Sequence, residues 1–125
     1  MNPSNAIRLL LVVLCAHAAA ATTIYVNGAT GNDDWDGLCE QWDGGTCGPK
    51  KTIQAGINAA QPGDEVVIAD GTYTGVGNKD PDFGGKPITV RSASGDPALC
   101  VIDCEAAGRG LYFHSGEGAT RSSRD

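Results

Sequence analysis

The chain has 125 residues, a formal net charge of −6 and eighteen glycines, and only 6% of its residues are aromatic. The length allows one small domain, and the acidic charge argues against nucleic acids and anionic membranes as partners. Many glycines with few aromatic residues indicate turns between short strands and argue against a helical bundle.

The first 21 residues have the features of a secretory signal peptide. Arg8 supplies a positive charge, Leu9 to Leu14 form an apolar run, and the small residues Ala19 to Ala21 suit a cleavage site. The apolar run is short for a membrane span. We therefore expect residues 1–21 to be removed and the mature chain, beginning near Thr22, to be secreted or held at the cell surface. The alternative is an uncleaved anchor.

A short strand is predicted over Thr23–Asn27, followed by a glycine-rich loop over residues 28–48. Oxygen-bearing side chains gather in this loop at Asn32, Asp33, Asp34 and Asp36. They are the ligand type that Ca²⁺ prefers, so a calcium site is one hypothesis, although the distal glutamate of a calcium loop is missing. The other explanation is an Asx-rich turn, in which these side chains bond their own backbone.

Four cysteines remain once Cys15 is removed with the signal peptide. An even count in an exported chain indicates disulfides. Cys39 and Cys47 flank a glycine-rich stretch and are predicted to pair. Cys100 and Cys104 would lie about 13 Å apart in extended chain, which is too far for a disulfide. They either pair across a turn or remain as two thiols in a strand core.

An amphipathic helix is predicted from about Thr52 to Ala60. Ile53, Ile57 and Ala60 recur at the spacing of one helix face, and the Thr52 hydroxyl can cap the N-terminus. Pro62-Gly63 ends the helix, because proline cannot donate the next backbone hydrogen bond.

Three apolar runs follow the helix at nearly even spacing. They begin at Val66, Ile88 and Leu111, which are 22 and 23 residues apart. Such a period is typical of rungs in a parallel β-solenoid, and the helix would then cover the open first rung. A small β-sandwich with regular strand spacing is the alternative.

Six short motifs occur in a fixed order along the mature chain. They are Tyr25-Val26-Asn27, Gly31-Asn32-Asp33, Asp36-Gly37, Thr52-Ile53-Gln54, Pro62-Gly63-Asp64 and Gly71-Thr72-Tyr73. Together they resemble the N-terminal module of the pectin-lyase-like superfamily, and residues 86–92 and 100–104 resemble the rungs that follow it in secreted bacterial members.

The resemblance implies an all-β, right-handed parallel β-helix with an N-terminal capping helix. Residues 22–64 would form the cap, residues 65–118 the first rungs, and residues 119–125 a polar tail. The stretch Leu38–Gly48 lengthens the usual link before the helix. The next rung would begin beyond Asp125, so we expect a solenoid that is incomplete at its C-terminus and that self-associates through this uncapped end.

The resemblance also implies an extracellular protein that binds or degrades acidic polysaccharide. Fold alone does not fix the reaction. In this superfamily the catalytic groups lie on later rungs, so any lyase or hydrolase activity would be carried by rungs outside this chain, with this segment supplying structure. The alternatives are a non-enzymatic, adhesin-type surface protein and an N-terminal fragment without independent function.

Two sets of side chains are candidates for contact with sugar. Lys86 and Arg91 could meet the carboxylate of a uronate, and otherwise they are routine surface residues. Trp35, Trp42 and Tyr73 could stack on sugar rings, and otherwise they pack beneath the N-terminal loop.

No catalytic residue is assigned. Asp70, Asp80 and Asp82 are carboxylates near turns, and no base is placed beside them by the sequence. Residues 114–117 contain His, Ser and Glu, but neighbours on one strand alternate faces and so do not converge as a triad.

Overall fold

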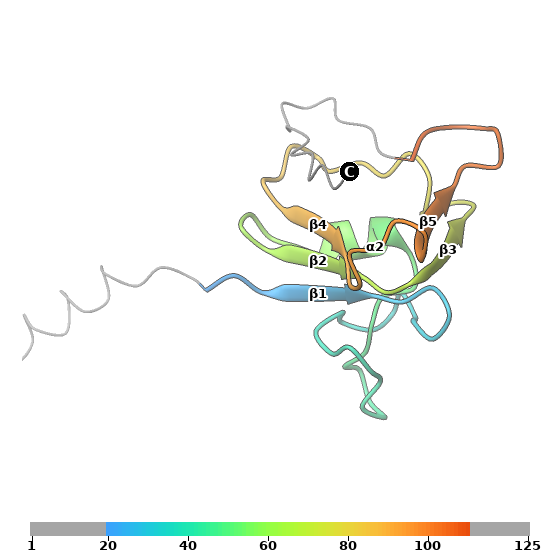
Figure 1. Ribbon diagram of the computed structural model, residues 1–125. Helices are drawn as coiled ribbons and strands as arrows, with labels where there is room; N and C mark the ends of the chain where they lie inside the picture. The colour runs from blue at the N-terminus through green and yellow to red at the C-terminus, as the bar shows by residue number, and fades with distance from the viewer. Residues whose placement is uncertain (1–19, 111–125) are drawn as a thin grey trace, which may run out of the picture.

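The computed structural model describes residues 20–110 (Figure 1). In chain order they form β1 (Thr23–Val26), α2 (Ile53–Ala59), β2 (Glu65–Ile68), β3 (Gly71–Thr74), β4 (Thr89–Ser92) and β5 (Cys100–Asp103). The strands predicted over residues 23–27, 66–68 and 88–90 and the helix predicted over residues 52–60 are confirmed, with bounds that differ by one or two residues.

The strands form two small sheets in which every pairing is parallel. One sheet has the order β1-β2-β4, and the other consists of β3 and β5. In the first sheet Ile24 lies opposite Val66, which lies opposite Val90. In the second sheet Tyr73 lies opposite Ile102. Figure 1 shows β2 between β1 and β4, with β5 next to β3.

The predicted right-handed parallel β-helix is wrong. A solenoid repeats one unit along the chain, whereas the observed pairings join residues at unequal separations, as in Ile24 with Val66, Val66 with Val90, and Tyr73 with Ile102. The described residues form a small α/β structure with two parallel sheets, one short helix and no closed solenoid. The apolar period reflects parallel pairing between strands but does not close them into rungs. The third predicted strand, at Leu111, and the tail 119–125 lie outside the described residues.

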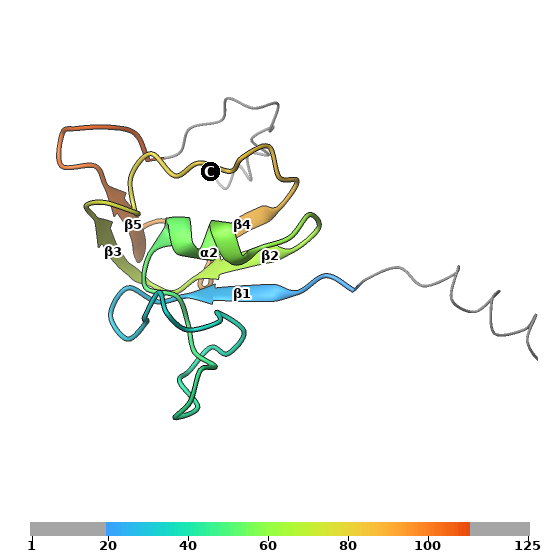
Figure 2. The ribbon, with the colours of Figure 1, turned by 180° about the vertical axis from the view of Figure 1, so that it is seen from behind.

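A single apolar core joins the helix to the sheets. It contains Ile24, Val26, Ile53, Ile57, Ala60, Val66, Ile68, Tyr73 and Phe83, all of them buried. The helix packs against β1 and β2 and covers one face of the three-stranded sheet (Figure 2). Burial of these side chains is the main stabilising term for so small a domain.

A capping residue fixes the start of the helix, and one glycine lets the helix lie close to the sheet. The Thr52 hydroxyl accepts a hydrogen bond from Ala55 N–H at 3.2 Å, so the predicted N-cap is confirmed. A Cβ atom at Gly56 would lie 2.4 Å from Val26 Cγ2. The glycine therefore allows a close approach between helix and sheet that any side chain would prevent.

Candidate functional site

Residues 28–48 form a loop that backbone hydrogen bonds fasten to β1. Tyr25 N–H donates to Gly37 O, Lys50 N–H donates to Tyr25 O, and Asn27 N–H donates to Lys50 O, each at 2.8 Å. These bonds join β1 to Gly37, within the loop, and to Lys50, just after it. The sheet therefore fixes where the loop projects (Figure 1).

A disulfide closes the outer part of this loop. Cys39 and Cys47 are bonded, with their Cα atoms 5.3 Å apart, as the sequence predicts. Inside the closed segment Asp43 N–H donates to Cys47 O at 2.9 Å, and Gly45 N–H donates to the Asp43 carboxylate at 2.7 Å. The cross-link and the turn together limit the conformations that the loop can adopt.

Two tryptophans stack on the loop. The rings of Trp35 and Trp42 are nearly parallel, at 6°, with their centroids 5.3 Å apart. The indole N–H of Trp42 donates to Gly45 O at 2.7 Å. The backbone of Gly48 packs against the Trp35 ring, because a Cβ atom added at Gly48 would lie only 2.4 Å from Cε3 of Trp35.

The stack leaves one tryptophan open to solvent. Trp35 is half-buried, whereas Trp42 is 56% exposed although one of its faces meets Trp35. The exposed surface of Trp42 is therefore the face turned away from Trp35 and the ring edge. Leu38, on the same loop, is 51% exposed.

The third aromatic candidate, Tyr73, lies in the core and is 2% exposed. Its hydroxyl donates to Ala69 O at 2.7 Å and accepts a bond from Gly28 N–H at 3.4 Å. Burial raises the pKa of this phenol. Tyr73 thus packs beneath the start of the loop.

Three of the four proposed calcium ligands accept hydrogen bonds from backbone N–H groups. Asn32 accepts from Asp34 N–H, and Asp36 accepts from Leu38 N–H, each at 2.9 Å, as in Asx turns. The described part of the chain gathers no three His, Cys, Asp or Glu side chains that could hold a metal. Ca²⁺ binding through Asn32, Asp33, Asp34 and Asp36 stays a prediction.

Asp33 has a structural role that the sequence did not reveal. Its carboxylate accepts bonds from Lys51 N–H at 2.8 Å and from both the N–H and the hydroxyl of Thr52, at 2.9 and 3.0 Å. It thereby ties the loop to the residues that begin α2. These partners are some eighteen residues away in the chain, so no local pattern announces the contact.

Lys86 lies at the C-terminal end of α2. Its ammonium donates to the carbonyl oxygens of Ile57, Asn58 and Ala60. The Ile57 carbonyl also accepts from the Ala60 N–H at 3.2 Å, and a cation is favourable at this end of the helix dipole. The structure thus engages the Lys86 side chain in capping the helix.

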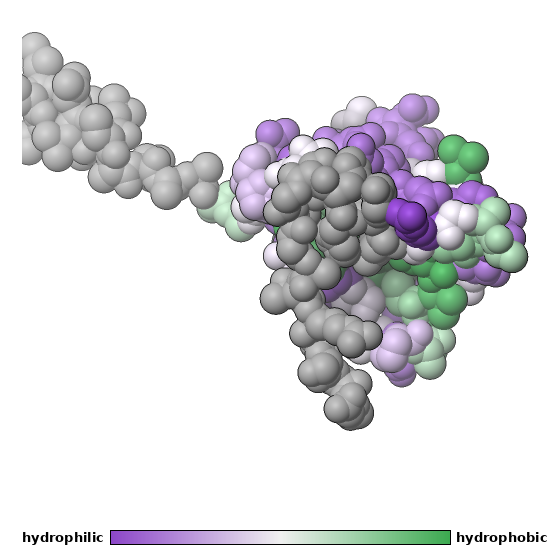
Figure 3. Space-filling view, turned by 90° about the horizontal axis from the view of Figure 1, so that it is seen from above, coloured by the Kyte–Doolittle hydropathy of each residue, from purple (hydrophilic) through white to green (hydrophobic). Residues whose placement is uncertain are grey.

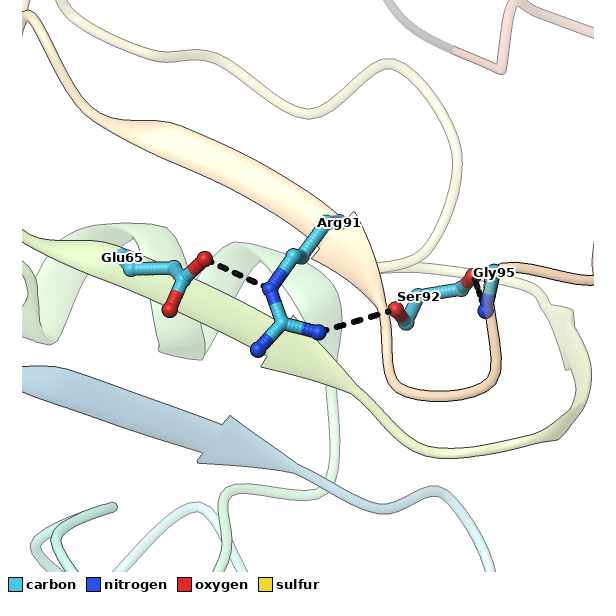
Figure 4. A network of polar contacts seen from close by, with 4 residues as sticks. All are labelled: Glu65, Arg91, Ser92 and Gly95. Atoms are coloured by element: carbon cyan, nitrogen blue, oxygen red, sulfur yellow. Dashed lines mark hydrogen bonds and ion pairs between the residues drawn. The ribbon is translucent and has the colours of Figure 1, made fainter. Parts of the chain in front are cut away.

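Arg91 lies on the opposite, outer face of the three-stranded sheet (Figure 4). Its Nε donates to a Glu65 carboxylate oxygen at 2.5 Å, and its Nη1 donates to Ser92 O at 3.4 Å. The Arg91 side chain is 50% exposed. The structure therefore does not bring Lys86 and Arg91 together around one uronate subsite.

Cys100 and Cys104 carry thiols that form no disulfide within residues 20–110. Both are half-buried, at the start and just beyond the end of β5. Burial, and secondarily the charge of Asp70, raises the pKa of the Cys100 thiol. This thiol is thereby kept in its less reactive, protonated form.

The carboxylates near the turns accept structural hydrogen bonds, two of them from distant segments and one from within its own turn. Asp70 accepts from the Ser94 hydroxyl at 2.6 Å, Asp80 from Arg109 N–H at 2.7 Å, and Asp82 from Gly84 N–H at 2.8 Å. Residues 114–117, which include the sequence His-Ser-Gly-Glu, lie outside the described residues.

Between residues 20 and 110 no helix is long and apolar enough to cross a membrane. Comparison with known proteins gives no match to a family model, a curated protein or a solved structure. The assignment to the pectin-lyase-like superfamily is therefore wrong, because neither the observed fold nor any match supports it.

Proposed function

We propose that this chain is an exported protein that binds polysaccharide through the exposed face of Trp42. The observation that carries the proposal is an indole held flat by Trp35 and by its bond to Gly45, on a disulfide-closed loop, with 56% of its surface in solvent. Aromatic rings attract the C–H faces of pyranose sugars by dispersion and by their quadrupole. A rigid ring loses little entropy when a ligand binds.

The charge around this ring favours an uncharged sugar. Residues 28–48 carry Asp33, Asp34, Asp36, Glu40 and Asp43 and no Lys or Arg. A uronate would be repelled by these carboxylates, whereas the hydroxyls of a neutral sugar can donate to them. The cations expected to attract an acidic polysaccharide are engaged elsewhere, Lys86 at the helix terminus and Arg91 with Glu65. We therefore favour a neutral polysaccharide over the acidic one that the sequence suggested.

Isothermal titration with short neutral β-glucan and xylan oligosaccharides, and with oligogalacturonate, tests this function. We expect Trp42→Ala to weaken binding of the neutral ligand by about tenfold, in line with the loss of one stacking contact. Val76→Ala is the matched control, because Val76 is 94% exposed and lies outside the loop. Binding of oligogalacturonate alone, or binding that Trp42→Ala leaves intact, would contradict the proposal.

A second candidate is a structural role through self-association. Among the described strands, β3, β4 and β5 each pair along one edge only, whereas the outer edge of β1 bonds to Gly37 and Lys50. Seen from above, hydrophobic residues gather toward one side of the surface (Figure 3), and Leu99 and Val101 next to or within β5 are 51% and 39% exposed. Open edges of this kind pair readily with other chains. Sedimentation should show association that increases with concentration, and a monomer at all concentrations would exclude this role.

A further inference from the structure

Asp64 is a buried acid at the junction of α2 and β2. Only 8% of its surface is exposed. One carboxylate oxygen accepts from Gln61 N–H at 2.8 Å, and the other accepts from Thr22 N–H at 2.9 Å. The residue thus holds the turn that ends the helix and, at the same time, the residue that precedes β1.

Thr22 is held on two sides. Its carbonyl oxygen accepts from Glu65 N–H at 3.0 Å, while its nitrogen donates to Asp64. Ala20 and Ala21 are exposed and line a cavity of about 260 Å³ together with Pro62 and Gly63. Thr22 is therefore held by backbone bonds just before β1, and the expected cleavage site lies immediately before it.

The surroundings of Asp64 favour its ionised form. The pKa of Asp64 is lowered chiefly by the backbone bonds from Gln61 and Thr22 and also by the charge of Lys86. Glu65, the next residue, is paired with Arg91 on the outer face of the sheet. The charged groups around this site are thus the Asp64 carboxylate, the Lys86 ammonium, and the ion pair between Glu65 and Arg91.

We infer that removal of the signal peptide after Ala21 converts the Thr22–Asp64 hydrogen bond into an ion pair that locks β1 onto β2. Hydrolysis of the Ala21–Thr22 peptide bond adds hydroxyl to the Ala21 carbonyl carbon and hydrogen to the Thr22 nitrogen. The new amine takes one more proton from water and becomes an ammonium. Because Thr22 O remains bonded to Glu65 N–H, the ammonium stays beside the Asp64 carboxylate.

The ion pair predicts a defined pH window. A carboxylate partner raises the pKa of the folded α-amino group above its unfolded value of about 7.7–8.0. The stabilisation is then complete below the unfolded pKa of the amine and is lost as the pH rises through the folded pKa. At the acid end it is lost as Asp64 protonates, which occurs below the usual pKa of an aspartate.

Two forms of the chain, residues 22–125 and residues 21–125, test the inference. One begins at Thr22, released from a fusion by a protease that leaves no extra residue, and the other retains Ala21, which restores the amide at Thr22 and moves the amine away. We expect the Thr22 form to have a folding equilibrium constant about tenfold larger near pH 6.5, corresponding to about one unit of α-amino pKa shift. Asp64→Asn in both forms should abolish the difference.

Urea unfolding between pH 5 and 10 and NMR titration of the α-amino group give two separate readouts. Equal stability of the two forms at every pH, an α-amino pKa within the unfolded range, or mass spectrometry showing that the exported chain starts elsewhere would overturn the inference. It rests on the export part of the proposed function and not on sugar binding. If the Thr22 ion pair forms but no sugar binds, only the proposed sugar binding by Trp42 would therefore be refuted.

Discussion

The helix–sheet core and the disulfide-closed loop are stabilised in opposite ways. The core is built from side chains such as Ile53, Ile57 and Val66 that are wholly buried. The loop of residues 28–48 has few buried side chains and is held by Asx bonds, a cross-link and its attachment to β1. The difference teaches that this small domain separates stability from the proposed sugar recognition: the core fixes the fold, and the loop can present an exposed ring without weakening it.

The largest loss of stability is expected when a cavity is opened in the core. Ile57→Ala should destabilise the protein by about 2–5 kcal/mol, because Ile57 is completely buried between helix and sheet. Urea unfolding followed by circular dichroism measures the loss. Val76→Ala, at a 94% exposed position, should change stability by less than about 0.5 kcal/mol. Similar small effects at both positions would mean that α2 does not form the core.

Opening the loop should have a smaller effect. Replacing both Cys39 and Cys47 by Ser should destabilise the protein by about 2 kcal/mol, since the cross-link closes a short segment and acts largely through the unfolded chain. We also expect the Trp35–Trp42 stack to loosen, which tryptophan fluorescence reports. Alkylation of both thiols in the exported, unreduced protein would show that the bond does not form.

The buried acid Asp64 makes the stability of the helix–sheet core depend on pH. Because the pKa of Asp64 is lowered in the folded state, its stabilisation is present above the unfolded pKa, near 3.8, and is lost as the pH falls through the folded value. Asp64→Asn should therefore lower stability at pH 6 and flatten the acid part of the stability profile. An unchanged profile between pH 2 and 5 would show that Asp64 contributes nothing through its charge.

The smallest expected stability change is at the loop ring itself. Trp42→Ala should alter the free energy of unfolding by less than about 0.5 kcal/mol, as is usual at exposed positions, although it should weaken sugar binding by about tenfold. Thermal unfolding measures this directly. A loss comparable with that of Ile57→Ala would place Trp42 among the structural residues and would end the separation between core and loop.

Local features of the fold could be predicted from the sequence, and non-local ones could not. The spacing of Ile53 and Ile57, the Thr52 cap and the pairing of Cys39 with Cys47 are encoded by neighbours in the chain. The closure of strands into rungs was predicted from an apolar period, but the pairing of Tyr73 with Ile102 follows a different separation from that of Val66 with Val90. A period in apolar residues indicates strands without fixing which strands meet.

The candidate site shows the same limit. Trp35, Trp42 and Tyr73 carry identical signals in sequence, yet only Trp42 is mainly exposed. Lys86 and Arg91 are also alike in sequence, yet one caps a helix and the other pairs with Glu65. Burial and partner choice depend on contacts between distant segments, which composition and spacing do not specify.

The most direct test of the central claim is an NMR titration of the intact mature chain with a neutral oligosaccharide. We predict that the Trp42 indole N–H and backbone amides of residues 28–48 shift on binding, while amides of α2 and β2 remain unchanged. In Trp42→Ala the amide shifts should require about tenfold more oligosaccharide, while the rest of the spectrum stays unaltered. The claim would be contradicted by shifts centred on Arg91 and the outer sheet face, by binding of oligogalacturonate alone, or by no shifts at all.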